Sequence, residues 1–125
     1  MILVLDGHAF LWWARNASTL APEARAAISD PANEIIVSSA TVWELEIKRA
    51  LGKLIAPPDL MHVIDVEGFS CLPVSCQDGA AAARLPMHHR DPFDRMLVAQ
   101  ALRLDAVIVT RDSAIKVYAV EVLAA

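Results

Sequence analysis

Residues 91–110 read DPFDRMLVAQALRLDAVIVT, and the fold is decided in this stretch. Six side chains of its first part fall on one face at helical spacing: Phe93, Met96, Leu97, Gln100, Ala101 and Leu104. The Asp-Pro pair before them favours a helix start. The run that follows, residues 106–110, is apolar and rich in β-branched residues, which predicts a buried strand. A helix that leads directly into a buried strand is typical of α/β proteins with parallel sheets.

The same alternation of strand and helix patterns extends over the rest of the chain. Strands are predicted at residues 2–5, 34–38, 69–72, 106–110 and 120–123. Besides the helix after Asp91, helices are predicted at residues 9–14, 22–29, 39–52, 58–68 and 75–83. We therefore expect residues 1–125 to form a single domain, a three-layer α/β/α sandwich with a mostly parallel five-stranded sheet.

Composition excludes several classes of protein. The 125 residues carry a net charge of −4, and no apolar run approaches the roughly 20 residues that a membrane-spanning helix requires. The first residues do not resemble a secretory signal, so we expect a soluble, cytoplasmic protein. The negative charge argues against nucleic-acid binding through bulk positive potential, so any such contact must be local. Cys71 and Cys76 lack the partners of a zinc site and are expected to be buried thiols.

Four acidic residues are expected to meet at one edge of the predicted sheet. Asp6 directly follows the first strand, and Glu44 lies near the start of the helix after the second. Asp94 is in the first turn of the helix that leads to the fourth strand, and Asp112 comes two residues after that strand. Because ligands bind at the carboxyl ends of parallel strands, this edge is the expected functional site.

Each of these acids also has a local alternative. Asp6 is a good cap for a helix that begins near His8, and Thr41-Val-Trp-Glu44 has the spacing of a capping box. Asp112 suits a turn. For Asp91 the capping role is the preferred interpretation. These local roles do not explain why four acids would gather at one edge.

Carboxylates that lie this close repel one another, and some become protonated unless a cation is present. A site made only of oxygen ligands suits Mg²⁺ or Mn²⁺. Such an ion can activate water and stabilise charge on a phosphodiester. The four acids are therefore both the predicted metal ligands and the predicted catalytic residues.

Four segments of the chain, taken together, resemble the PIN-domain family and within it the VapC-like toxins of prokaryotic toxin–antitoxin pairs. The segments are residues 3–9 (LVLDGHA) with Trp12 and Trp13, residues 38–45 (SSATVWEL) with Lys48 and residues 52–54 (GKL), residues 85–86 (LP) with residues 89–101 (HRDPFDRMLVAQA), and residues 109–112 (VTRD). The resemblance implies a small α/β/α sandwich and metal-dependent cleavage of RNA. By position, the family's acidic cluster falls on the same four residues: Asp6, Glu44, Asp94 and Asp112.

Further residues are assigned around this cluster. Thr110 is expected to support the site through its hydroxyl, and Arg95 and Arg111 are expected to contact substrate phosphates. His8, His88 and His89 are weaker candidates for RNA contacts. Where similar sequences usually have Thr or Ser after the first Asp, this chain has Gly7, which removes a hydroxyl from the site.

The segment Ala9-Phe-Leu-Trp-Trp-Ala14 is apolar on every side of a helix, which predicts burial all round. Either its own domain covers it, or Phe10, Trp12 and Trp13 contact a partner. The resemblance implies two such partners, a second copy of the chain and a cognate antitoxin. Since antitoxins of this kind often carry their own DNA-binding part, DNA contact is expected to be indirect.

Two other functions fit the sequence less well than a ribonuclease. A catalytically weakened PIN-like module that binds or assembles is supported only by Gly7. A phosphoryl-transfer protein with Asp6 as nucleophile would be expected to show a paired DxD pattern after the first strand, which is absent.

Overall fold

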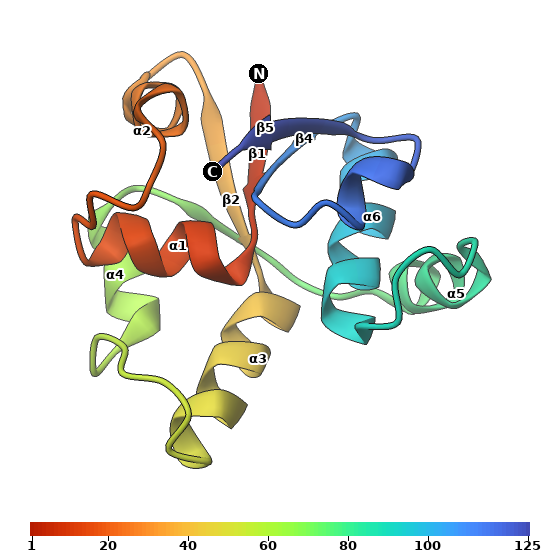
Figure 1. Cartoon of the computed structure of the whole chain (residues 1–125), viewed down its shortest axis with the longest axis horizontal. Helices are drawn as coiled ribbons and strands as arrows, with labels where there is room; N and C mark the ends of the chain where they lie inside the picture. Colours follow the sequence, from red (N-terminus) through yellow and green to blue (C-terminus); the bar gives the residue numbers. More distant parts are fainter.

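The computed structural model describes residues 1–125 and contains a sheet in which every neighbouring pair of strands is parallel (Figure 1). The strand order is β3-β2-β1-β4-β5. The strands are β1 Ile2–Leu5, β2 Glu34–Ser38, β3 Ser70–Leu72, β4 Val107–Thr110 and β5 Glu121–Ala124. The predicted five-stranded sheet is confirmed, and it is parallel throughout rather than mostly so.

Six α-helices connect and cover the strands. They are α1 Gly7–Ala14, α2 Pro22–Ser29, α3 Ser39–Ala50, α4 Leu60–Val66, α5 Cys76–Arg84 and α6 Pro92–Leu104. A short 3₁₀ helix, η1 Ile115–Val117, precedes β5 and was not expected from the sequence. None of the helices is long and apolar enough to cross a membrane.

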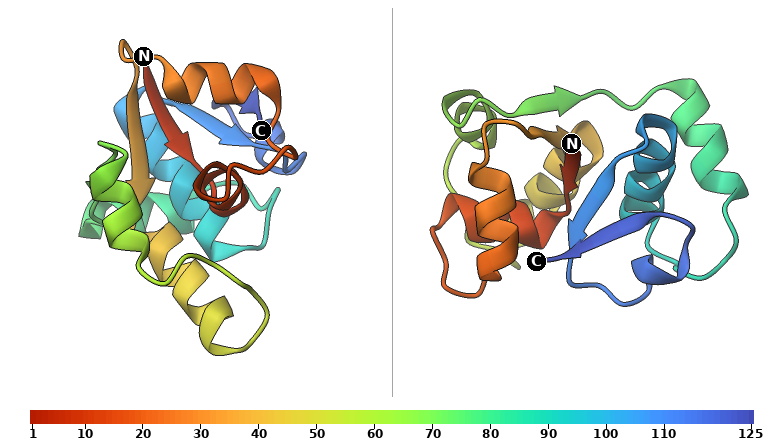
Figure 2. Two further views of the ribbon diagram at one scale, coloured as in Figure 1. Left: turned by 90° about the vertical axis from the view of Figure 1, so that its left-hand side faces the viewer. Right: turned by 90° about the horizontal axis from the view of Figure 1, so that it is seen from above.

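Side chains of β1 alternate between two cores, as the pleat of a strand requires. Leu3 and Leu5 belong to a core closed by α1, α2 and α4, whereas Val4 belongs to a second core closed by α6 and η1. Figure 2 shows the sheet between these two groups of helices, which confirms the three-layer arrangement. A strand buried on both faces reads as a continuous apolar run, which is why β1 was recognisable in the sequence.

The polar pairing of α5 with α6 fixes the helix that leads into β4. Asp78 is 1% exposed and accepts hydrogen bonds from Arg103 Nε at 2.7 Å and Gln100 Nε2 at 3.1 Å. Burial acts to raise the pKa of Asp78, but the hydrogen bonds from Arg103, Gln100 and the backbone of Ser75 outweigh it and lower the pKa to about 2. The carboxylate therefore stays charged and holds α5 against α6.

The two cysteines are exposed and unpaired, so their predicted burial is wrong. Cys71 lies on β3, one of the two edge strands of the sheet, and Cys76 is the first residue of α5, on the surface. Edge positions lack the second covering layer that buries the central strands. Residue type alone does not reveal which strand is at the edge.

Candidate functional site

Asp6 lies between the end of β1 and the start of α1, where it is buried to 5% exposure. Its Oδ1 accepts the backbone N–H of Ala9 at 2.8 Å, so the predicted capping role is confirmed. Its Oδ2 accepts a hydrogen bond from the hydroxyl of Thr110 at the end of β4. Burial raises the pKa of Asp6 against these two hydrogen bonds. Each carboxylate oxygen keeps a further lone pair for another partner.

Glu44 projects from α3 toward the start of α1. The helix is capped by Ser38, which accepts the N–H of Ala40, so Thr41 is not the cap and the predicted capping box is wrong. The largely buried carboxylate of Glu44 instead pairs with Lys48 Nζ at 3.2 Å. A Cβ atom added at Gly7 would lie 3.1 Å from Glu44 Oε1, so the missing side chain leaves room for this carboxylate.

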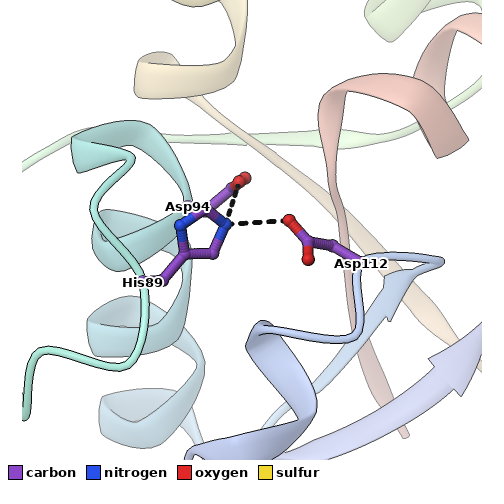
Figure 3. Close-up of side chains that lie close together, drawn as sticks. All are labelled: His89, Asp94 and Asp112. Carbon is purple, nitrogen blue, oxygen red and sulfur yellow. Dashed lines mark hydrogen bonds and ion pairs between the residues drawn. The ribbon is translucent and has the colours of Figure 1, made fainter.

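Asp94 and Asp112 are joined by the ring of His89 (Figure 3). His89 Nε2 lies 2.9 Å from Asp94 Oδ2 and 2.8 Å from Asp112 Oδ2. The other ring nitrogen, Nδ1, accepts the backbone N–H of Asp91 at 3.1 Å. Since Nδ1 is an acceptor, the proton of the neutral ring is on Nε2, which donates it to Asp112 and lies close to the carboxylate of Asp94.

The local alternatives for Asp91 and Asp112 are also confirmed. Asp91 caps α6 by accepting the N–H of Phe93 at 2.9 Å, and Asp112 Oδ1 accepts the N–H of Ala114 at 2.9 Å in a turn. Asp112 therefore uses one oxygen locally and directs the other to His89. Burial acts to raise the pKa of Asp112, but the hydrogen bonds from Ala114 and His89 outweigh it and lower the pKa.

The carboxylates repel one another most strongly at Asp94. Burial and then the negative charges of Asp91, Glu44 and Asp6 raise the pKa of Asp94 to about 7, against the opposing effect of His89. Burial lowers the pKa of His89, but the hydrogen bond to Asp112 and the surrounding carboxylates outweigh burial and raise it.

All four predicted acids line one pocket of about 390 Å³. The other residues that line it are Gly7, His8, Leu11, Leu45, Lys48, Lys53, Leu54, His89 and Asp91. Ligand atoms of His89, Asp94 and Asp112 lie within 4.8 Å of one another. A donor set made mainly of carboxylate oxygens, in which burial and then mutual repulsion raise the pKa of Asp94, fits a hard divalent cation such as Mg²⁺ or Mn²⁺.

Thr110 supports the acids rather than the substrate. Its fully buried hydroxyl donates to Asp6 and accepts the backbone N–H of Asp112 at 3.0 Å. One side chain therefore connects two of the four acids, and its burial keeps it away from a bound substrate.

Arg95 does not reach the pocket, and the predicted phosphate contact has to be corrected. Its guanidinium is buried and donates to backbone carbonyls and one hydroxyl, on Ala82, Ala83, Leu85, Pro86, His89 and Tyr118. Most of these carbonyls lie at and just beyond the end of α5, where a helix leaves its last carbonyls without partners. Arg95 is therefore a structural residue that fixes the segment before His89.

Arg111 is also directed away from the acids, so its predicted phosphate contact is corrected too. Its guanidinium donates to the carbonyls of Ala125 and Thr19 and lies 4.4 Å from the ring centre of Trp12. It does not line the pocket. The cations on the pocket wall are Lys48 and Lys53 instead, which the sequence showed only as a charged cluster.

The apolar segment in α1 is partly covered by its own domain. Phe10 is fully buried in the core, so its predicted role in partner binding is wrong. Trp12 and Trp13 are half-buried. Trp12 stacks on His8 with ring centres 5.6 Å apart, and Trp13 Nε1 donates to Glu67 at 3.1 Å. These two indoles are the part of the predicted surface that stays accessible.

The sequence matches the family model described as PIN domain over residues 3–121, and the chain therefore belongs to the PIN-domain family. No protein of curated function matches it at a significant level.

Chains of several solved structures share the fold over nearly the whole length. One is in VapBC2 from Rickettsia felis bound to a DNA fragment from their promoter, at 14% identity, with a TM-score of 0.71 and 98% of both chains covered. Another is in DNA-bound VapBC from Salmonella typhimurium, at 16% identity, a TM-score of 0.67, and 98% and 97% covered. A third is in FitAcB from Neisseria gonorrhoeae, at 19% identity, a TM-score of 0.65, and 99% and 97% covered.

Proposed function

We propose that this chain is a metal-dependent endoribonuclease, the toxin of a VapC-like toxin–antitoxin pair. The observation that supports the enzymatic part best is the gathering of Asp6, Glu44, Asp94 and Asp112 in one pocket. Burial and the neighbouring acids raise the pKa of Asp94 to about 7, and perturbed pKa values of this kind cluster at functional sites.

The proposed reaction is hydrolysis of an RNA phosphodiester, in which a water oxygen attacks phosphorus and the bond to the leaving oxygen breaks. Bound Mg²⁺ or Mn²⁺ supplies an activated water and stabilises charge on the phosphate oxygens. The four carboxylates hold and orient this centre, directly or through water. Thr110 positions Asp6 and Asp112, and the cap interactions of Asp6 and Asp112 keep both carboxylates in place.

The decisive experiment measures cleavage of labelled RNA by Asp6→Asn and Asp94→Asn in Mg²⁺, in Mn²⁺ and with chelator. We expect the cleavage rate of both variants to fall at least about 100-fold. Substitution of a residue that only hydrogen-bonds to a metal ligand already lowers metal affinity or activity about 10- to 100-fold. Asp65→Asn, an exposed change on α4, is the matched control and should cleave like wild type. A large fall in melting temperature with unchanged cleavage would show that Asp6 and Asp94 serve only the stability of the fold.

We further propose that the chain is a single cytoplasmic PIN domain that binds a cognate antitoxin, with DNA contacted only through that antitoxin, and that it forms a homodimer. The support for the antitoxin and for DNA contact through it is the likeness to structures of VapBC and of FitAB bound to DNA. The half-buried Trp12 and Trp13, with the neighbouring α2, offer a surface for such a partner.

A catalytically weakened PIN-like module is the second candidate, and Gly7 is the observation that favours it, because the hydroxyl usual at this position is missing. Retained antitoxin binding without metal-dependent cleavage would support this candidate. Asp6 as a covalent nucleophile fits poorly, because both of its oxygens accept hydrogen bonds and it is only 5% exposed.

A further inference from the structure

The acidic pocket has a basic wall formed by Lys48 and Lys53. They are two of the chain's three lysines, and they are the only lysine or arginine side chains that line the pocket. Lys48 Nζ lies 3.2 Å from Glu44, at the border between the acidic and basic parts of the wall. Lys53 is exposed and takes part in no ion pair.

The end of α3 brings the two lysines together. Gly52 has a φ of +71°, a left-handed conformation that L side chains rarely adopt. The turn it allows returns the backbone N–H of Lys53 to the carbonyl of Lys48 at 3.0 Å, and the N–H of Gly52 to the carbonyl of Arg49 at 3.0 Å. The backbone therefore fixes Lys53 beside the last turn of the helix that carries Lys48.

The third cation of this region is used for structure. Arg49 donates to the carbonyl of Ala56 at 3.0 Å and of Pro57 at 2.7 Å, and it pairs with Glu46. These contacts hold residues 53–57 back against α3. Because these contacts occupy the guanidinium of Arg49, the two lysines are the cations available at the pocket.

A pocket lined by five carboxylates repels a phosphodiester unless positive charge is placed beside it. A divalent cation held by the acids would neutralise part of this charge. The neighbouring phosphates of the RNA strand need a separate source of positive charge. Arg95 and Arg111 do not provide it, because their guanidiniums are bound to backbone carbonyls away from the pocket. Two lysines that act as flexible point charges suit contacts to backbone phosphates.

We propose that Lys48 and Lys53 bind a backbone phosphate next to the cleaved bond of a single-stranded RNA segment, and so fix the direction in which the strand crosses the pocket. This inference rests on the proposed ribonuclease function. A flexible single strand can bend to bring one phosphate to the acids and the next to the lysines, whereas a duplex is held by its regular shape.

The test measures binding of a short fluorescein-labelled single-stranded RNA by anisotropy, in Mg²⁺, with the Asp94→Asn protein as the background that does not cleave. In this background we expect Lys48→Gln and Lys53→Gln each to raise the Kd about fivefold or more, as for a lost charged hydrogen bond that is partly exposed. Each should also lower the salt dependence of log K by about 0.7, the value for one phosphate contact on a single strand. Lys53→Arg should keep most of the affinity.

Lys116→Gln is the matched control, since Lys116 is the chain's remaining lysine, is exposed on η1 and does not line the pocket. It should change neither the Kd nor the salt dependence. In the active protein, Lys53→Gln should raise KM and leave kcat nearly unchanged.

The outcomes separate this inference from the proposed function. Cleavage by wild type with unchanged Kd in both glutamine variants overturns the lysine contact and leaves the nuclease proposal intact. A wild-type protein that neither binds nor cleaves RNA overturns both. An equal loss in Lys116→Gln would show that only the net charge matters, which also overturns a specific contact.

Discussion

Asp94 is the residue whose charge costs the folded protein most. Its pKa of about 7 lies above the ordinary value of 3.8, so the folded protein binds this proton more tightly than the unfolded chain does. Its contribution to the free energy of unfolding is therefore largest below about pH 4 and is lost as the pH rises through about 7. In the metal-free protein, the titration of Asp94 should therefore make the free energy of unfolding smaller at pH 8 than at pH 5.

Asp94→Asn removes that cost. We expect the metal-free variant to be more stable than wild type at pH 8 by about 1–3 kcal/mol, after allowance for solvent screening, and nearly equal at pH 4. Thermal melts with chelator at the two pH values measure the difference. A lower melting temperature of the variant at pH 8 would contradict the electrostatic interpretation. In excess Mg²⁺ the sign should reverse, because the ion stabilises the wild-type carboxylates.

His89 competes with a cation for the oxygens of Asp94 and Asp112, because its Nε2 is hydrogen-bonded to Asp112 and lies 2.9 Å from Asp94 Oδ2. His89→Ala should therefore tighten Mn²⁺ binding about 3- to 10-fold, the equivalent of a hydrogen bond that no longer has to be broken. Isothermal titration calorimetry of the metal-free protein measures this. His88→Ala, where the ring packs on Tyr118 at 5.0 Å, is the control. Weaker Mn²⁺ binding in His89→Ala would mean that His89 is itself a ligand.

The position of a site residue could be predicted from the sequence where the residue directly follows the end of a strand. Asp6 and Asp112 follow β1 and β4, so their meeting depends only on parallel pairing. Arg95 and Arg111 were misassigned because their partners are carbonyls remote in sequence, at α5 and at Ala125. The position of His89 between two acids was equally hidden, since it depends on how a loop closes over α6.

At the scale of elements, the end of α3 can be tested directly. Gly52→Ala places a side chain at a φ of +71°, so we expect a loss of about 1 kcal/mol in stability and weaker RNA binding through Lys53. Gly79→Ala is the control, because Gly79 lies within α5, its φ is not positive, and an added Cβ would meet nothing within 4 Å. The free energy of unfolding of Gly79→Ala, measured with urea, should rise by about 0.5–1 kcal/mol. Equal effects of the two changes would exclude a special role for the turn.

Element boundaries were predicted best where turn residues mark them. Gly52 and Gly68 were expected to end helices, and both have positive φ. The predicted strand at residues 69–72 begins one residue later, as β3, and η1 was missed. β3 and η1 are only three residues long, too short to show a periodic pattern, so tertiary contacts decide them more than sequence pattern does.

At the scale of the whole molecule, partner binding can be tested at Trp13, one of the two accessible tryptophans of α1. Trp13→Gln should weaken antitoxin binding at least about tenfold and leave RNA cleavage by the isolated protein unchanged, since buried aromatic anchors dominate interfaces. Trp43→Gln on α3 is the control, because Trp43 is 65% exposed but lies on another element. Titration of purified antitoxin against wild type, Trp13→Gln and Trp43→Gln measures the difference in affinity. A loss of binding only in Trp43→Gln would move the partner surface to α3.

The hydrogen bond from Thr110 to Asp6 joins residues 104 positions apart, and β1 pairs with β4 near the centre of the sheet. Because synthesis proceeds from the N-terminus, Asp6 is made 104 residues before Thr110. Contacts of long sequence separation form late, so the nascent chain carries Asp6 and Glu44 without an assembled pocket until β4 has been made. In the proposed ribonuclease, the active pocket can therefore assemble only after β4 and the residues that follow it have been synthesised.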